Sequence, residues 1–326
     1  MKHLSRFAFA ISFAAAAALC LAAFHQSTIP TAFAAAAVAQ DQAPPDQNPA
    51  DQGPDPAAAN MAPSGPSYTT EAPPPPDQST EPAGQPPDDS GYAEMPTEQA
   101  TEAPPPLPDY DQPPAPGDGY IWTPGYWAWG AGGYYWVPGA WVEPPYVGGL
   151  WTPGYWGFYG GRYLFYPGHW GLHIGFYGGI NYGFGYIGLG YEGGYWNSGH
   201  FFYNRAYNHI NVRVVHNTYN YNAGNRGSFH RGGNNNSRPS YRGGGGVQAR
   251  PQPAEREAAH EPTAPRMNTQ VQHAQNYGAV RGQYAAQNHG QPPTPAISRP
   301  IPADHSSRPA SSNQSHGSGG SRGGHR

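Results

Sequence analysis

A six-residue motif that begins and ends with tryptophan constrains this chain most. Trp122-Thr-Pro-Gly-Tyr-Trp127 recurs as Trp136–Trp141 and again as Trp151–Trp156. A fourth, degenerate copy, Phe165–Trp170, has phenylalanine in its first position. The copies begin 14, 15 and 14 residues apart, which is a shorter period than that of most named solenoid repeats.

Turn signals alternate along this region. A Pro-Gly pair lies at the centre of each copy, and Gly-Gly pairs lie between copies at 132–133, 148–149 and 160–161. About five residues remain for each strand, which predicts a β-meander. With Pro-Gly as the hairpin turn, the two tryptophans of one copy face each other, although Pro-Gly prefers a type II turn whose twist suits a hairpin poorly. The predicted turn residues are Pro124, Gly125, Pro138, Gly139, Pro153, Gly154, Pro167 and Gly168.

Aromatic residues are concentrated in the same part of the chain. Residues 119–222 hold 33 of them in 104 positions. At roughly 25 cal/mol per Å² of buried area, their burial offsets the ordering of this segment only if almost every ring leaves water. A thin meander leaves one face wet, so we expect the rings to contact a partner, a ligand or another copy. The predicted interaction residues are Trp122, Trp127, Trp136, Trp141, Trp151, Trp156, Phe165 and Trp170.

The segment that follows, 171–222, combines glycine with aromatic residues. In Tyr182–Tyr186 the rings occupy alternate positions, which predicts a strand with rings on one face and bare backbone on the other. A flexible glycine-rich loop is one alternative. A glycine-zipper membrane helix is another, but the segment has no long apolar run and carries Asn181 and Glu192. Asn211–Tyr221 is the last β-like stretch.

The N-terminus has the pattern of an export signal. Basic Met1–Arg6 precedes an apolar run, Phe7–Phe24, and an Ala-Val-Ala site ends at Ala39. This pattern predicts a signal peptide over residues 1–39, cleaved between Ala39 and Gln40, with Ala34 as the second-choice site. A membrane anchor is the alternative, but the small residues and the polarity that follows favour cleavage.

Cysteine usage agrees with export. The only cysteine, Cys20, lies inside the predicted signal, so the mature chain has no disulfide. A lipoprotein would use such a cysteine as its lipid anchor, but Leu19 stands where a small residue is expected. We expect an exported protein without a transmembrane span after processing, located in the periplasm, at the outer membrane or outside the cell.

Two arms of opposite charge flank the aromatic region. Residues 40–118 contain fifteen acids, no Lys or Arg, and several proline runs, so we predict a disordered acidic linker. From His200 onward there are fourteen Arg and four acids, a net charge of +10. Residues 223–326 are predicted to form a disordered Arg/Gly/Gln/Pro-rich tail, with short helices at 254–261 and 270–275.

The predicted fold is therefore a mostly disordered chain around a central all-β meander rich in aromatic residues and glycine. The meander comprises the Trp-Pro-Gly repeats at 119–170 and the Gly/aromatic segment at 171–222. We expect little helix apart from the signal peptide and the short C-terminal pieces.

Motifs for catalysis are absent from the sequence, so we predict no enzyme, no catalytic residue and no cofactor. Glu143 and Glu192 are the only acids in 119–222, and nothing aligns them for glycoside hydrolysis. The histidines lack metal-ligand spacing, so we predict no metal site. Three Arg-Gly-Gly motifs, starting at 231, 242 and 322, are similar to segments that bind single-stranded nucleic acid. Export argues against nucleic acid and favours anionic envelope polymers, with a solvated tail as the alternative.

The Trp-x-Pro-Gly-x-Trp copies resemble the YXWGXW (WXXGXW) repeat-containing proteins of proteobacteria and their relatives. Gly175–Tyr186 and Gly199–Asn204 look like the glycine-aromatic blocks that follow the repeats in many of those proteins. The resemblance covers roughly residues 120–222. It implies an exported protein of the cell envelope and supplies no active site.

Two classes of function agree with these features. The first is a structural or interaction protein that acts through aromatic self-association or by docking onto other envelope proteins. The second is a carbohydrate-binding module for an anionic or neutral polysaccharide, because Trp and Tyr faces stack on sugar rings. Asn, Asp or Glu beside each tryptophan would favour the second class, and these residues are scarce in 119–170.

Overall fold

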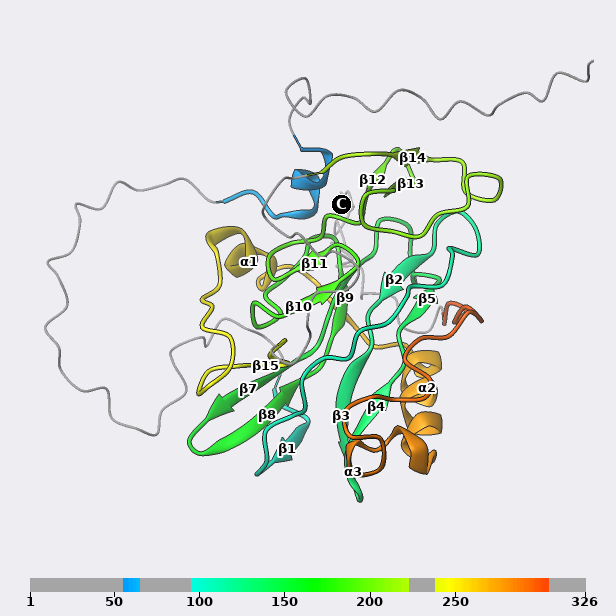
Figure 1. Cartoon of the computed structure of the whole chain (residues 1–326). Coiled ribbons are helices and arrows are strands. Elements are labelled where there is room, and N and C mark those ends of the chain that lie inside the picture. Colours follow the sequence, from blue (N-terminus) through cyan, green and yellow to red (C-terminus); the bar gives the residue numbers. More distant parts are fainter. Residues whose placement is uncertain (1–54, 65–94, 223–237, 305–326) are drawn as a thin grey trace, which may run out of the picture. The chain divides into compact units, whose positions relative to one another are not determined.

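The computed structural model describes residues 55–64, 95–222 and 238–304 (Figure 1). All of these residues belong to one compact unit, Asp46–Arg326. The predicted signal peptide, its cleavage site at Ala39 and Gln40, and much of the acidic linker lie outside the described residues. The described part is mostly strands, which confirms the predicted all-β, aromatic-rich centre.

Two long β-hairpins built from the repeats form that centre (Figure 1). We call residues 121–142 the first hairpin and residues 150–171 the second hairpin. Each consists of four short strands, two on either side of a tight turn. The strands are β2 (Ile121–Thr123), β3 (Tyr126–Gly130), β4 (Gly133–Val137) and β5 (Ala140–Val142), then β6 (Leu150–Thr152), β7 (Tyr155–Tyr159), β8 (Arg162–Tyr166) and β9 (His169–Gly171).

One copy of the motif pairs with the next copy, not with itself. In the first hairpin β2 pairs with β5 and β3 with β4, both antiparallel, in a register that continues unchanged across the gaps between them. Trp122 therefore faces Trp141, and Trp127 faces Trp136. The second hairpin repeats this arrangement with copies three and four. The predicted pairing of the two tryptophans within one copy is wrong.

The second hairpin turns at the predicted glycine pair 160–161, and the first turns at residues 131–132, one position before the predicted pair 132–133. In the second hairpin Gly160 and Gly161 have φ angles of 56° and 80° and lie between paired Tyr159 and Arg162. Two central residues with positive φ are what a type I′ turn requires, and its twist matches that of the strands. The Pro-Gly pairs lie instead between two successive strands on the same side of a hairpin, as between β2 and β3. Their assignment as hairpin turns is therefore wrong.

Each Pro-Gly pair lies opposite the Pro-Gly pair of the facing copy, by continuation of the register. Proline has no N–H to donate, so the ladder is interrupted there on both strands. Groups outside the ladder form hydrogen bonds with the backbone N–H groups that the interruption leaves unpaired. The Gly125 N–H donates to the Tyr110 hydroxyl over 3.0 Å, and the Gly139 N–H donates to the Pro295 carbonyl over 3.1 Å.

The glycine of each pair is required by close approach. A Cβ on Gly139 would lie 2.7 Å from Cζ2 of Trp122, the first tryptophan of the facing copy. A Cβ on Gly154 would lie 2.9 Å from Cζ of Phe165, which holds the equivalent position in the fourth copy. The first ring of each copy thus lies against the glycine of the copy opposite. The motif therefore encodes a pair of copies, and the repeating unit of structure is the whole hairpin.

Residues 171–222 add two smaller hairpins, as predicted for a β-rich segment. However, Tyr182–Tyr186 is a tight turn and not one strand, because Phe184 and Gly185 both have positive φ. Within the expected stretch 211–221, only Thr218–Tyr219 forms a strand. The strands are β10 (Asn181–Gly183), β11 (Tyr186–Ile187), β12 (Gly194–Asn197), β13 (His200–Asn204) and β14 (Thr218–Tyr219).

The prediction of disordered arms is wrong for the described parts of both arms. Residues 95–118 pack on the hairpins, with Leu107 and Ala115 buried. Residues 238–304 do so as well, and α2 lies along β3 and β4 (Figure 1). The arm elements are η2 (Pro56–Asn60), β1 (Glu98–Ala100), β15 (Tyr241–Arg242), α1 (Pro253–Ala258), β16 (Ala264–Pro265), α2 (Asn268–Gly278), η4 (Arg281–Gln283) and α3 (Ala285–Asn288). Both predicted short helices are present as α1 and α2.

The arms supply hydrogen-bond acceptors to several of the buried tryptophans. A buried indole usually has an acceptor for its N–H, and the proline-rich segments supply backbone carbonyls for this purpose. Trp127 donates to Pro106 over 3.1 Å, and Trp141 donates to Pro113 over 2.8 Å. On the other side, Trp136 donates to the Pro295 carbonyl over 2.9 Å. The amino-acid composition of these segments predicts solvated spacers and does not reveal that their carbonyls accept hydrogen bonds from tryptophans.

No helix in the described part of the chain has the length and apolar character needed to cross a membrane.

Candidate functional site

The eight predicted interaction rings lie in the core. Their exposed fractions are 5% or less, so they present no surface to a partner and the predicted docking through them is wrong. They contact each other across each hairpin, mostly edge to face. The ring-centroid distances are 5.4 Å for Trp122–Trp141, 5.1 Å for Trp127–Trp136, 5.2 Å for Trp151–Trp170 and 5.2 Å for Trp156–Phe165.

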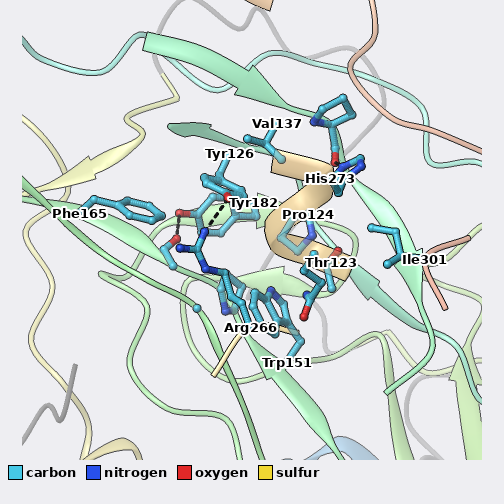
Figure 2. A pocket seen from close by; sticks show the side chains of 15 residues that line it. Thr123, Pro124, Tyr126, Val137, Trp151, Phe165, Tyr182, Arg266, His273 and Ile301 are labelled. Carbon is cyan, nitrogen blue, oxygen red and sulfur yellow. Dashed lines mark hydrogen bonds between the residues drawn. The ribbon is translucent and has the colours of Figure 1, made fainter. Parts of the chain in front are cut away.

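A small cavity lies where the Pro-Gly pairs of the two hairpins meet (Figure 2). Its volume is about 30 Å³, which is room for a single water molecule. Arg266 extends from the C-terminal arm to the Tyr126 hydroxyl, 3.1 Å away. Burial raises the pKa of Tyr126, whose ring stacks on Phe165. The predicted turn residues therefore meet at a packing junction that is too small for a ligand.

A larger concavity, which we call the aromatic groove, has a volume of about 390 Å³. This volume is in the range of ligand clefts, roughly 300–1,000 Å³. Aromatic and hydrogen-bonding side chains share its lining. The aromatic and polar side chains of the lining include Asp118, Tyr120, Glu143, Tyr146, Trp196, His200 and Asn217.

Four separate segments build the aromatic groove. Residues 143–147 connect the two hairpins, and Asp118–Tyr120 lead from the N-terminal arm into β2. The β12–β13 hairpin supplies Trp196 from β12 and His200 from β13, next to its turn, while Asn217 precedes β14. That turn is tight, since Ser198 and Gly199 have φ angles of 50° and 79°.

Trp196 is held in place from two sides although it is only half-buried. Its indole N–H donates to the Gly149 carbonyl over 3.0 Å, which ties β12 to the connection between the hairpins. Its ring meets buried Phe201 edge to face, with centroids 5.3 Å apart. The ring therefore has a defined orientation before any ligand binds.

Tyr120 and Tyr146 are the other half-buried rings of the groove. The carbonyl of Tyr120 accepts the Tyr203 hydroxyl over 2.9 Å, which fixes that segment to β13. The hydroxyl of Tyr146 is buried and has no hydrogen-bond partner among the described residues. Burial raises the pKa of Tyr146 to about 12, so this ring is neutral at physiological pH.

The two carboxylates of the groove are each held by the protein. Asp118 accepts the backbone N–H and the ring Nδ1 of His216, at 2.9 and 2.7 Å. Partial burial alone would raise the pKa of Asp118, but the hydrogen bonds from His216 lower it below its usual value. Glu143 accepts the Ala303 N–H over 3.1 Å. Both groups remain accessible, because Glu143 is exposed and the Asp118 side chain is 40% exposed.

Sequence reasoning missed this groove. We looked for polar side chains beside the tryptophans of 119–170, but the fold brings Asp118, His200 and Asn217 from outside that range. Trp196 lies outside the repeats, yet it is the tryptophan that lines the groove. Val147, at the rim, is an exposed apolar residue at 70% exposure, and nothing in the sequence alone signals it. Arg242, singled out in an Arg-Gly-Gly motif, is buried beside Tyr159 and Phe176 instead of facing a ligand.

Comparison with known proteins yields one match. No curated protein and no solved structure matches the chain. A family model, the WXXGXW repeat, matches residues 117–142 in two copies, a range that includes all four strands of the first hairpin. The second hairpin continues the same pattern beyond the matched residues. The chain therefore contains the WXXGXW repeat that its sequence resembles.

Proposed function

We propose that this chain is an exported binding protein of the cell envelope that docks its ligand in the aromatic groove. One observation carries the proposal: Tyr120, Tyr146 and Trp196 are half-buried around a concavity that also holds two carboxylates. Apolar faces with a few convergent polar groups are typical of binding clefts. Export is supported by the basic, apolar and small-residue pattern of residues 1–39.

In this proposal the repeats are a scaffold. Their rings are covered by the chain's own arms. We therefore assign the aromatic contact with a ligand to Trp196 and its neighbours in the groove, and not to the repeats. The groove sits on the connection between the hairpins and on the tip of the β12–β13 hairpin. Trp196 is already held by the Gly149 carbonyl and by Phe201, so little free energy is lost to ordering this ring when a ligand binds.

Binding without catalysis is part of the proposal. The oxygens of Asp118 accept hydrogen bonds from His216, and Glu143 accepts one from Ala303. The lowered pKa of Asp118 keeps it ionised, whereas a general acid needs a raised pKa. The two carboxylates are thus suited to hold hydroxyl or amine donors in place.

Co-sedimentation with isolated envelope tests the proposal. We expect the exported chain to pellet with the envelope fraction, and Trp196→Ala to reduce the bound fraction about tenfold. Trp129→Ala is the matched control, because Trp129 is also half-buried and contacts Tyr134 at the tip of the first hairpin, away from the groove. Equal binding by Trp196→Ala and wild type would refute the proposal.

Docking of another envelope protein, or of a second copy, is a second candidate. It is favoured by the exposed apolar side chains of Val147 and Leu172, 70% and 55% exposed, at the connection between the hairpins. Light scattering of the wild type and of Val147→Ser with Leu172→Ser tests it. A mass that is the monomer's in both at all concentrations excludes the second copy.

A further inference from the structure

We infer that the aromatic groove binds a polysaccharide chain of neutral or amino sugars. This inference rests on the proposed function and names the chemical class of its ligand. Three features of the groove carry it: the ring faces, the sign of the charges in the lining, and the hydrogen-bonding capacity that Glu143 retains.

The ring faces select a ligand with flat, weakly apolar surfaces. Sugar rings present such faces through their C–H groups, and aromatic side chains pack well against them. Trp196 is oriented before binding by Gly149 and Phe201. A ring that needs no ordering contributes more of its contact energy to affinity. Tyr120 and Tyr146 supply further rings from a different wall of the same groove.

The charges exclude anionic polymers from this groove. Asp118 and Glu143 line it, and no Lys or Arg is among the described residues of its lining. A uronic acid chain, a phosphate-bearing polymer or a nucleic acid would bring like charge beside these carboxylates, which opposes binding. A neutral sugar meets no such repulsion, and a protonated amino sugar is attracted. The expectation of anionic polymers, which came from the arginine-rich tail, therefore does not extend to the groove.

Asp118 already accepts hydrogen bonds from His216 and Asn217, but Glu143 keeps free acceptor sites. An ionised carboxylate offers about four lone-pair positions, and Glu143 uses one of them for Ala303. Hydrogen bonds from hydroxyl or ammonium groups to a carboxylate are among the stronger ones in proteins. His200 and Asn217, on the remaining walls, add groups that can donate and accept. Rings for stacking and fixed acceptors for hydroxyls thus occur together, which was the feature expected of a carbohydrate site.

Calorimetric titration with defined hexasaccharides tests the inference. The probes are cello-oligosaccharide (neutral), N-acetylglucosamine oligomer (neutral), glucosamine oligomer (cationic) and galacturonate oligomer (anionic). We expect one or more of the first three to bind and the anionic probe not to bind. Trp196→Ala should weaken binding about tenfold, the change that a stacking ring worth roughly 1.4 kcal/mol produces. Trp196→Phe keeps a ring and should retain part of the affinity, while Trp129→Ala should bind as wild type.

Charge variants separate the two kinds of sugar. Glu143→Gln should weaken binding of the glucosamine probe, because it removes a negative charge. Added salt should also weaken this binding, because counterions screen the attraction between the carboxylate and the ammonium groups. Tighter binding of the galacturonate probe would overturn the inference. So would the failure of every sugar while the envelope fraction still binds in a Trp196-dependent way, and the proposed function would survive that result. Loss of Trp196 dependence in both assays would refute the two together.

Discussion

Replacing Gly139 with alanine tests the explanation of the repeat most directly. The added Cβ would lie 2.7 Å from Cζ2 of Trp122, 3.0 Å from the backbone nitrogen of Gly125 and 3.1 Å from the hydroxyl oxygen of Tyr110. None of these atoms moves easily. Trp122 is fully buried, Gly125 is backbone, and the Tyr110 hydroxyl is held by the Gly125 N–H at 3.0 Å.

The expected magnitude follows from overpacking. Extra carbon forced into a packed core costs about 1–3 kcal/mol, and Gly139 has no room to relax on any of the three sides. We expect Gly139→Ala to lower the free energy of unfolding by that amount. Chemical denaturation, followed by the near-ultraviolet circular dichroism of the tryptophans, measures it.

The matched control is Gly117→Ala. A Cβ there would meet only Cε2 of Tyr120, at 3.9 Å, an ordinary contact distance. A Gly→Ala change at such a position gains about 0.4–1 kcal/mol, because it reduces the entropy of the unfolded chain. If Gly139→Ala proves as stable as Gly117→Ala, the glycine is not required by the facing tryptophan and our explanation of the motif is wrong.

Three further predictions concern register, pH and processing. A double-mutant cycle with Trp122→Leu and Trp141→Leu should give a coupling free energy of about 0.5–1.5 kcal/mol in the free energy of unfolding. The same cycle with Trp127→Leu in place of Trp141→Leu should give a coupling near zero. The reverse result would support pairing of the two tryptophans within one copy. Burial raises the pKa of Glu255 to about 7 from 4.5. Because the unfolded state loses this proton first, the free energy of unfolding should fall as pH rises from 4.5 to about 7, and Glu255→Gln should remove that contribution in a urea-denaturation pH series. N-terminal sequencing of exported material should begin at Gln40, whereas an intact Met1 would contradict export.

Local patterns in the sequence predict the type of each element here better than its pairing. The Gly-Gly pair at 160–161 has the conformational freedom that a type I′ turn needs and ends a hairpin, but the same pair at 148–149 lies in the connection between the hairpins. Pro124-Gly125 breaks a strand, but a break is compatible with a turn or with two interrupted strands in register. The choice depends on which residues stand opposite, and that information lies about fourteen residues away in the next copy. One feature of the sequence argued against Pro-Gly as the hairpin turn, because the type II turn that Pro-Gly prefers fits the twist of a hairpin poorly.

The arms and the groove could not be predicted from composition because both depend on contacts between distant segments. Proline-rich residues 104–116 look solvated when counted alone, since they offer little apolar surface. Their carbonyls acquire a use only when the indoles of Trp127 and Trp141 stand opposite. The groove similarly joins Asp118 to Asn217, about one hundred positions apart, and neither residue has a distinctive local sequence.

The bond from Trp136 to the Pro295 carbonyl has a consequence for the order of events in the proposed export. A chain that crosses a membrane from its N-terminus delivers Trp136 long before Pro295, which follows it by 159 positions. Until then the outer edge of β5 also lacks Ile301, whose N–H bonds the Trp141 carbonyl over 2.9 Å. Contacts of such long range form slowly. In the proposed export, the first hairpin would therefore gain these contacts only after the chain has been translocated as far as Ile301.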